Sequence, residues 1–190
     1  PVPAGNPQAI RAGGVWICTG GGRGVTAVVA REIGRRFNLK LHLLGTAPQP
    51  ASDARWRGLN AAKLKELKRE MAIEARNQGR SPADEWSRVE KAIELDESLR
   101  QFSEAGIEWR YHRCDVTNRG ELDSVLQSIR AEQGPIDGII HGAGIEAACK
   151  FFSKKPENVR RTIASKCDGA ALLMELTRDD PLQYFVGFGS

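Results

Sequence analysis

The residues from Thr19 to Gly24 (TGGGRG) have the composition of a turn that could bind a phosphate group. Gly20, Gly22 and Gly24 would let the backbone turn sharply and come close to a diphosphate. The Thr19 hydroxyl could brace the turn by bonding to the backbone, and the planar guanidinium of Arg23 could make a bidentate contact with a phosphate. The residues alone also allow an ordinary tight turn that carries a solvated arginine.

The segments on either side of this turn favour phosphate binding. An apolar run at 15–18 (VWIC) precedes it, and a second strand-like run follows at 39–44 (LKLHLL). Between them, apolar residues recur at helical spacing at Val25, Val28, Val29, Ile33 and Phe37. The three segments predict a β-α-β unit, in which the positive end of the helix dipole faces the anion. The common motif G-x-G-x-x-G is not present as written, and the turn reads Thr-Gly-x-x-x-Gly at 19–24.

A second turn with glycines, His141-Gly142-Ala143-Gly144, follows the apolar run at 136–140 (IDGII). The carboxyl ends of neighbouring strands in a doubly wound sheet share one crevice, so both glycine turns would face the same ligand. Gly142 and Gly144 would let the backbone pass beside an adenosine ribose, or they could form an ordinary turn. His141 lies inside this turn on the cofactor face, which argues against a role in proton transfer.

Two further sets of residues stand at predicted strand ends. The second strand ends at Gly45-Thr46, where a dinucleotide fold commonly meets the adenosine ribose with an acid for NAD or a base for NADP. Neither residue is charged. Asp115 follows the alternating run at 107–114 (IEWRYHRC) and could accept a hydrogen bond from an adenine amine. It could equally belong to the cap of the next helix.

The order of these elements predicts an α/β fold with a doubly wound, Rossmann-like, mostly parallel sheet. A helix is expected between Asn118 and Gly134, and a fifth strand at 184–188 (YFVGF). A long helix is expected from Glu157 to Thr177, with Val159, Ile163, Ala170, Leu173 and Leu176 facing inward. Because the chain stops directly after the fifth strand, we expect a sheet that is truncated there.

The chain is expected to form one domain at 14–190, preceded by a linker at 1–13 that contains three prolines. Residues 51–105 are predicted to be a helical insertion after the second strand. Their second helix has Ser81 as N-cap and Pro82 at the first position, and it ends at Gly106. The insertion could pack on the rim of the domain or serve as a surface for a neighbouring domain.

The composition excludes several classes of protein. With 41% hydrophobic and 27% charged residues, the chain is an ordinary globular protein. No apolar run or signal pattern indicates a membrane or secretion, so we expect a cytoplasmic protein. A net charge of +4 with alternating acids and bases suits an anionic small ligand better than nucleic acid. The cysteines have no metal-ligand spacing, so no metal site is expected; they stand at Cys18, Cys114, Cys149 and Cys167.

Together these motifs resemble the short-chain dehydrogenase/reductase family, and most nearly the ketoreductase domains of polyketide synthases and polyunsaturated fatty-acid synthases. The matching segments are TGGGRGVT at 19–26, LLG at 43–45, DV at 115–116, HGAG at 141–144, TIASKCDGA at 162–170 and FVGFGS at 185–190. The resemblance implies NADPH-dependent reduction of a β-ketoacyl thioester. The substrate would be carried on the phosphopantetheine arm of an acyl carrier protein, beside neighbouring synthase domains.

The resemblance also implies roles for individual residues. Lys166 takes the place of the active-site lysine, which would lower the pKa of a tyrosine and orient the nicotinamide ribose. From composition alone it would be a surface lysine. Ser190 takes the place of the serine that donates a hydrogen bond to the substrate carbonyl. The family's proton-donating tyrosine, and an asparagine four residues after it, lie further along, so we expect these 190 residues alone to be inactive. Cofactor contacts would follow the matched motifs, at Thr19, Gly20, Gly22, Arg23, Gly24, Val25, Gly45, Thr46, Asp115, Val116, Gly142, Ala143, Gly144 and Lys166.

At the end of the second strand the chain departs from the family pattern. Many of these ketoreductases have Gly-Arg there, and the arginine binds the 2'-phosphate of NADP, whereas this chain has Gly45-Thr46. Arg23 is the other place where the family puts a base for that phosphate. Since no acid stands at Gly45 or Thr46, we expect NADPH rather than NADH. The alternative function is a non-catalytic nucleotide-binding or scaffolding module.

Overall fold

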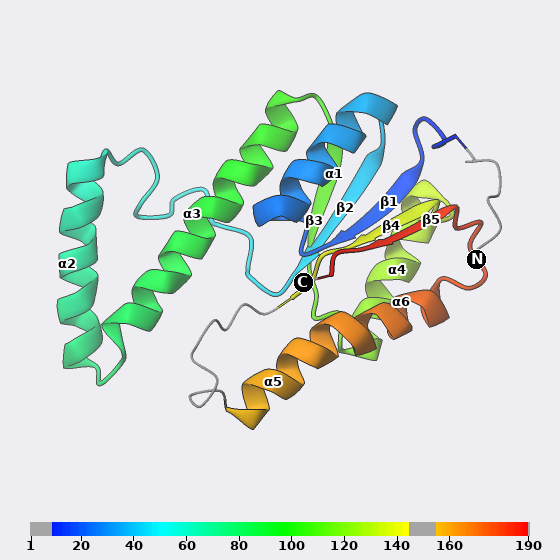
Figure 1. The fold of residues 1–190 in the computed structure, drawn as a ribbon. Helices are drawn as coiled ribbons and strands as arrows, with labels where there is room; N and C mark the ends of the chain where they lie inside the picture. Colours follow the sequence, from blue (N-terminus) through cyan, green and yellow to red (C-terminus); the bar gives the residue numbers. More distant parts are fainter. Residues whose placement is uncertain (1–8, 145–154, 190) are drawn as a thin grey trace. The chain divides into compact units, whose positions relative to one another are not determined.

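The computed structural model describes residues 9–144 and 155–189. In this part of the chain, five strands form one parallel sheet in the order β3-β2-β1-β4-β5 (Figure 1). The chain enters at the centre and winds outward to both edges, so the predicted doubly wound α/β fold is confirmed. The strands are β1 Val15–Thr19, β2 Lys40–Gly45, β3 Glu108–Arg113, β4 Gly138–His141 and β5 Tyr184–Gly187.

The register of the strands brings the carboxyl ends to one edge of the sheet. Thr19 at the end of β1 pairs with Leu44 on one side and with His141 on the other. Gly45 pairs with Arg113, and His141 pairs with Gly187. The turns that follow these strands therefore start side by side, as a crevice at a topological switch point requires.

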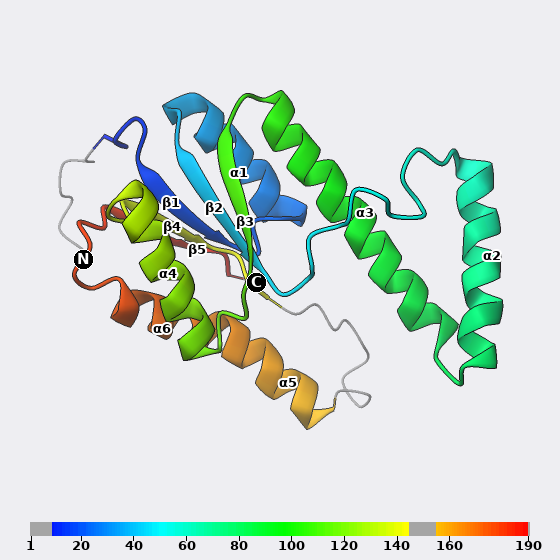
Figure 2. The ribbon, with the colours of Figure 1, turned by 180° about the vertical axis from the view of Figure 1, so that it is seen from behind.

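Helices cover both faces of the sheet (Figures 1 and 2). Helix α1 (Gly24–Phe37) lies on one face, and helices α4 (Arg119–Gln133) and α6 (Gly169–Leu176) lie on the other. The α1 face toward the sheet consists of small residues, and a Cβ at Gly34 would stand 2.8 Å from Leu41 Cδ1. The helix therefore lies close to β2, while Val25 and Val28 are 67% and 54% exposed.

The core on the α4 and α6 face is aliphatic. Strand residues that point to this face meet one stripe of α4, as alternation in strands and a 3.6-residue period in helices require. Burying each such side chain contributes about 1.5–3 kcal/mol. The fully buried members of this cluster are Val15, Ile17, Leu44, Cys114, Leu122, Leu126, Ile129, Ile136, Ile139 and Leu173.

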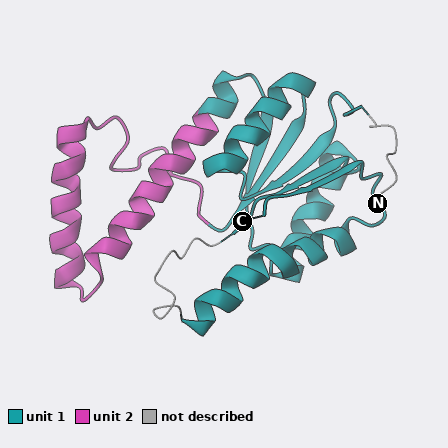
Figure 3. Ribbon diagram, viewed as in Figure 1, with its two compact units in different colours: residues 1–46, 101–190 teal, residues 47–100 magenta. Residues whose placement is uncertain are grey.

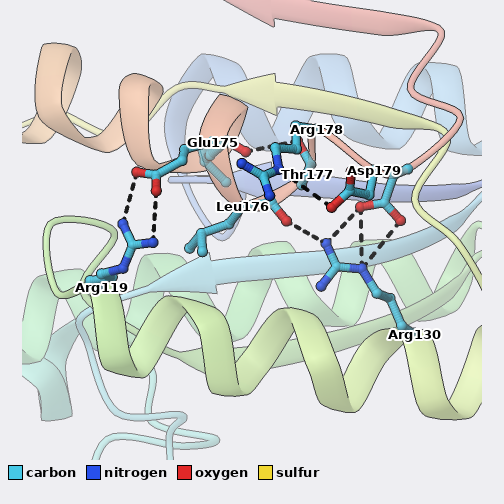
Figure 4. Close-up of polar contacts among 9 residues, drawn as sticks. Arg119, Arg130, Glu175, Leu176, Thr177, Arg178 and Asp179 are labelled. Atoms are coloured by element: carbon cyan, nitrogen blue, oxygen red, sulfur yellow. Dashed lines mark hydrogen bonds and ion pairs between the residues drawn. The ribbon is translucent and has the colours of Figure 1, made fainter.

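Polar contacts join α4 to α6 and to the turn that follows it (Figure 4). Arg130 donates to the Leu176 carbonyl at 2.7 Å and to the buried Asp180 carboxylate at 2.6 Å. Asp180 also accepts the backbone N–H of Ile136 at 3.0 Å. At the start of α4, exposed Arg119 pairs with Glu175. Arg130 thus fixes the connection between α6 and β5 against α4.

The predicted long helix is present, with a change of helix type in its middle. Helix α5 (Pro156–Ile163) continues into a π-helical turn, η2 (Ala164–Asp168), and then into α6. The N–H of Gly169 bonds to the carbonyl of Ala164, five residues earlier. The expected burial of Val159 and Ile163 is wrong, because they are 40% and 54% exposed. A π turn holds one residue more than an α turn, so the stripes of α5 and α6 fall out of step.

Residues 47–100 form a compact unit of their own, coloured magenta in Figure 3. The unit contains helix α2 (Ala61–Asn77) and most of helix α3 (Pro82–Glu104). Ser81 Oγ accepts from Asp84 N at 3.3 Å, as expected of an N-cap. Leu67 and Ala75 on α2 and Leu95 on α3 are buried, and Lys68 Nζ lies 4.9 Å from the Trp86 ring centroid. None of the helices in the described residues has the length and apolar character needed to cross a membrane.

Candidate functional site

The turn after β1 has a backbone shape that favours glycine. Gly20 has φ +67°, and its N–H donates to the Leu44 carbonyl at 2.8 Å. A Cβ at Gly20 would come within 2.7 Å of the Gly142 carbonyl oxygen. Gly24 has φ +62°, and a Cβ added there would meet no heavy atom within 4 Å. Gly20 is therefore required by packing as well as by φ, whereas at Gly24 only φ favours glycine and the space above the helix start is open.

The N-terminus of α1 fits an anionic group. Arg23 stands at the N-cap and makes no side-chain capping bond, and the first turn holds no acid. By contrast, Asn60 caps α2 and Asn118 caps α4 with their side chains. An uncapped helix start behind an open glycine turn can receive a diphosphate through its backbone N–H groups. The residues present thus fit a dinucleotide cofactor at this place.

The glycine turn after β4 packs directly on the turn after β1. Gly142 N donates to the Thr19 carbonyl at 2.9 Å, and a side chain at Gly142 would overlap Thr26 in the first turn of α1. The two glycine turns that the sequence assigned to one crevice are therefore in contact. The position of Thr26 against Gly142 was not predicted from the sequence.

A buried chain of hydrogen bonds connects these turns to the π turn. Ala143 N donates to Thr19 Oγ1 at 3.2 Å, and Thr19 Oγ1 lies 2.7 Å from His141 Nδ1. His141 Nε2 lies 3.0 Å from the Lys166 carbonyl oxygen. A carbonyl only accepts, so Nε2 carries the hydrogen and Nδ1 accepts from the Thr19 hydroxyl. Burial lowers the pKa of His141, which agrees with a neutral ring that holds structure together.

Lys166 lies in the π turn, and its side chain reaches the carboxyl ends of β4 and β5. Its Nζ donates to the Phe188 carbonyl at 3.0 Å, and a Cβ at Gly144 would stand 3.5 Å from this nitrogen. Phe188 N in turn bonds to the His141 carbonyl at 3.0 Å. The structure therefore brings Lys166 and Gly144 together at the edge where both glycine turns lie. Ser190 lies outside the described residues.

Close packing explains why glycine follows this turn. A Cβ at Gly169 would come within 2.9 Å of Val116 Cγ2 and 3.2 Å of His141 Cε1. Val116 is itself buried, so it packs closely against the residue that follows the π turn. Sequence analysis did not single out Gly169, because a glycine inside a helical pattern gives no information about its neighbours.

The ends of β2 and β3 surround a cavity of about 410 Å³ lined by Thr46, Arg113, Asp115 and Glu121. A Cβ at Gly45 would lie 2.7 Å from the Tyr111 hydroxyl oxygen. Asp115 Oδ1 accepts from the N–H and the hydroxyl of Thr117, so Asp115 stabilises the turn before α4, whose N-cap is Asn118. Arg113 was not identified from the sequence.

Comparison with known proteins gives one family. A family model described as the KR domain matches residues 14–190. The polyketide synthase ThaG of Burkholderia thailandensis is 26% identical over 189 residues, 99% of this chain, and the polyketide synthase PksL of Bacillus subtilis is 33% identical over 112 residues, 59% of this chain. The chain spans only 2% of the length of each of these synthases.

Solved structures show the same fold. A ketoreductase from the macrolactin assembly line superimposes with a TM-score of 0.67 at 22% identity, over 98% of this chain and 30% of its own length. A ketoreductase domain from the bacillaene assembly line gives a TM-score of 0.64, also at 22% identity, over 93% and 33%. Because the family match extends from residue 14 to residue 190, this chain belongs to the KR domain family, the ketoreductases of the short-chain dehydrogenase/reductase type.

Proposed function

We propose that this chain is part of a ketoreductase that uses NADPH to reduce a β-ketoacyl thioester to the β-hydroxyacyl thioester. The substrate would arrive on the phosphopantetheine arm of an acyl carrier protein, within a cytoplasmic polyketide or fatty-acid synthase. Membership of the KR domain family and the match to polyketide synthases support this proposal. The observation on which it depends most is the position of Lys166 beside Gly144 at the carboxyl edge of the sheet.

The residues of the two glycine turns would hold the cofactor. The backbone from Gly20 to Gly24 and the start of α1 would receive the diphosphate, with Arg23 as the nearest cation. Gly142, which packs against Thr26, and Gly144 would let the backbone pass beside the adenosine ribose. NADPH, when bound there, would supply the hydride.

Lys166 would act on both the ribose and the proton donor. An ammonium group has three donors, and the Phe188 carbonyl uses one of them. The others would bond the nicotinamide ribose and lower the pKa of the tyrosine that the family carries further along. Ser190 would donate to the substrate carbonyl oxygen as negative charge develops on it.

The test is the activity of the domain in its natural full-length protein, with NADPH and a small β-keto thioester. Lys166→Ala should lower kcat/KM by about 10² to 10⁴, the usual contribution of assisted proton transfer. Lys155→Ala removes an exposed lysine from the start of α5 and is the matched control. A Lys166→Ala variant as active as the parent would contradict the assignment.

The same assay separates the second candidate, a non-catalytic nucleotide-binding or scaffolding module. Such a module would bind a dinucleotide and leave every β-keto thioester unreduced. Parent protein that binds NADPH but shows no turnover would therefore favour that alternative.

A further inference from the structure

The end of β3 places an arginine beside the residues expected to meet the adenosine ribose. Arg113 pairs with Gly45 in the sheet, and the next residue, Cys114, donates its N–H to the Gly45 carbonyl at 2.9 Å. The Arg113 side chain lines the cavity of about 410 Å³ together with Thr46, Asp115 and Glu121. A ligand that reaches Thr46 from the strand ends would therefore also meet Arg113.

The acids in this cavity are bonded to their own turn. Glu121 Oε2 accepts from Asp115 N at 3.0 Å, and Glu121 Oε1 accepts from Asn118 Nδ2 at 2.8 Å. Asp115 Oδ1 accepts twice from Thr117. Neither carboxylate forms an ion pair with Arg113, whose side chain makes no hydrogen bond or ion pair with any residue in the described ranges.

A second arginine, Arg23 in the glycine turn, acts electrostatically on a residue beside this cavity. Burial raises the pKa of the Tyr111 hydroxyl, and the positive charges of Arg23 and Arg113 oppose that shift. The Tyr111 hydroxyl lies over Gly45, where a Cβ would stand 2.7 Å from its oxygen. Positive charge from Arg23 in the turn after β1 and from Arg113 on β3 thus acts on the Tyr111 hydroxyl at the end of β2.

We propose that Arg113 binds the 2'-phosphate of NADPH and, with Arg23, selects NADPH over NADH. The inference rests on the proposed function. A planar guanidinium can hold a phosphate by two parallel hydrogen bonds, and the Thr46 hydroxyl can donate a third. Without these arginines, Asp115 and Glu121 would repel the phosphate and leave a cavity better suited to the free 2'-hydroxyl of NADH.

The test is calorimetric binding of NADPH, NADH and adenosine 2',5'-bisphosphate to the natural protein and its variants. Removing a charged hydrogen-bond donor should weaken the two ligands with a 2'-phosphate by roughly ten- to a hundredfold. Arg113→Ala should show this loss and keep its affinity for NADH. Arg113→Lys should recover part of it, because lysine keeps the charge without the fork.

Arg110→Ala is the matched control. Arg110 lies on the same strand and pairs with Glu132, so its removal takes one positive charge from β3 without reaching the cavity. Its affinities should equal those of the parent. Circular dichroism of Arg113→Ala should equal that of the parent, because the side chain is exposed.

The outcomes separate this inference from the proposed function. A parent that binds NADPH, with an Arg113→Ala variant of equal affinity, would overturn the role of Arg113 and leave the proposed function standing. A parent that binds NADH more tightly would overturn the inference and the choice of NADPH. A parent that binds neither dinucleotide would overturn the proposed function as well.

Discussion

Replacing the Thr19 hydroxyl by a methyl group should destabilise the domain more than its small change in volume suggests. Thr19 is fully buried, and its hydroxyl accepts from Ala143 N while it donates to His141 Nδ1. Thr19→Val keeps the shape and removes both bonds. His141 cannot compensate by moving its hydrogen to Nδ1, because Nε2 would then face the Lys166 carbonyl as a second acceptor.

The size of this stability loss follows from the polar atoms that Thr19→Val leaves without a hydrogen-bond partner. A buried polar atom without a partner costs about 1–3 kcal/mol, and His141 is 4% exposed. The Ala143 N–H adds less, because that residue is half-buried and water can reach it. We expect a loss of about 2–3 kcal/mol, or a Tm lower by about 4–12 °C for a domain of this size. Thr19→Ser keeps the hydroxyl and loses one buried methyl, so it should cost about 1 kcal/mol.

Urea denaturation of the three proteins measures these differences, and ¹⁵N shifts of the His141 ring report the hydrogen bond directly. The Nδ1 shift should move in Thr19→Val and stay in place in Thr19→Ser. A Thr19→Val protein as stable as Thr19→Ser, with an unchanged Nδ1 shift, would refute the bonding pattern given above.

Burial lowers the pKa of His112 to about 4, so between this value and about 6.5 the unfolded chain binds a proton that the folded one does not. The free energy of unfolding should therefore reach its full value above pH 6.5 and fall by about 1–2 kcal/mol toward pH 4, a range reduced because the ring is half-exposed. In urea titrations, His112→Gln should reduce this dependence of stability on pH. Gly169→Ala should lower stability by about 1–2 kcal/mol in the same assay, because the steric cost of its methyl group against Val116 exceeds the free energy gained from the better helix propensity of alanine. A variant more stable than the parent would contradict this packing. Arg130→Ala leaves the buried Asp180 carboxylate with the Ile136 N–H but without its cation, and it should cost about 3–5 kcal/mol. Arg119→Ala removes an exposed ion pair and should change the unfolding midpoint far less. Equal losses of stability in Arg119→Ala and Arg130→Ala would show that burial does not set the strength of these two ion pairs.

The sequence predicted the helices and strands well because each depends mainly on residues that are close together in the chain. The five strands are short apolar or alternating runs, and the Ser81-Pro82 start of α3 depends on neighbours within one turn. The contact between the two glycine turns was also predictable, since topology alone brings strand ends to one edge.

The remaining features depend on contacts between distant residues. Thr19 and His141 are separated by more than a hundred positions, and no pattern in either segment indicates that they bond. Arg113 belongs to an alternating run and carries no signal of its own, and only the pairing with Gly45 shows what lies beside it. The exposure of Ile163 was missed because a helical stripe was continued through a turn whose period is not 3.6.

Because of the π turn, the number of residues between Ile163 and Gly169 determines where Lys166 lies. Deleting one residue there would restore regular α-helical bonding, but it would rotate α5 by about 100° and shift it by about 1.5 Å relative to α6. The Lys166 carbonyl would then move away from His141 Nε2, and the Lys166 side chain would swing away from the Phe188 carbonyl. A shortened helix could gain intrinsic stability while losing the lysine's place, so deletions in this segment carry a penalty that substitutions on the outer face do not.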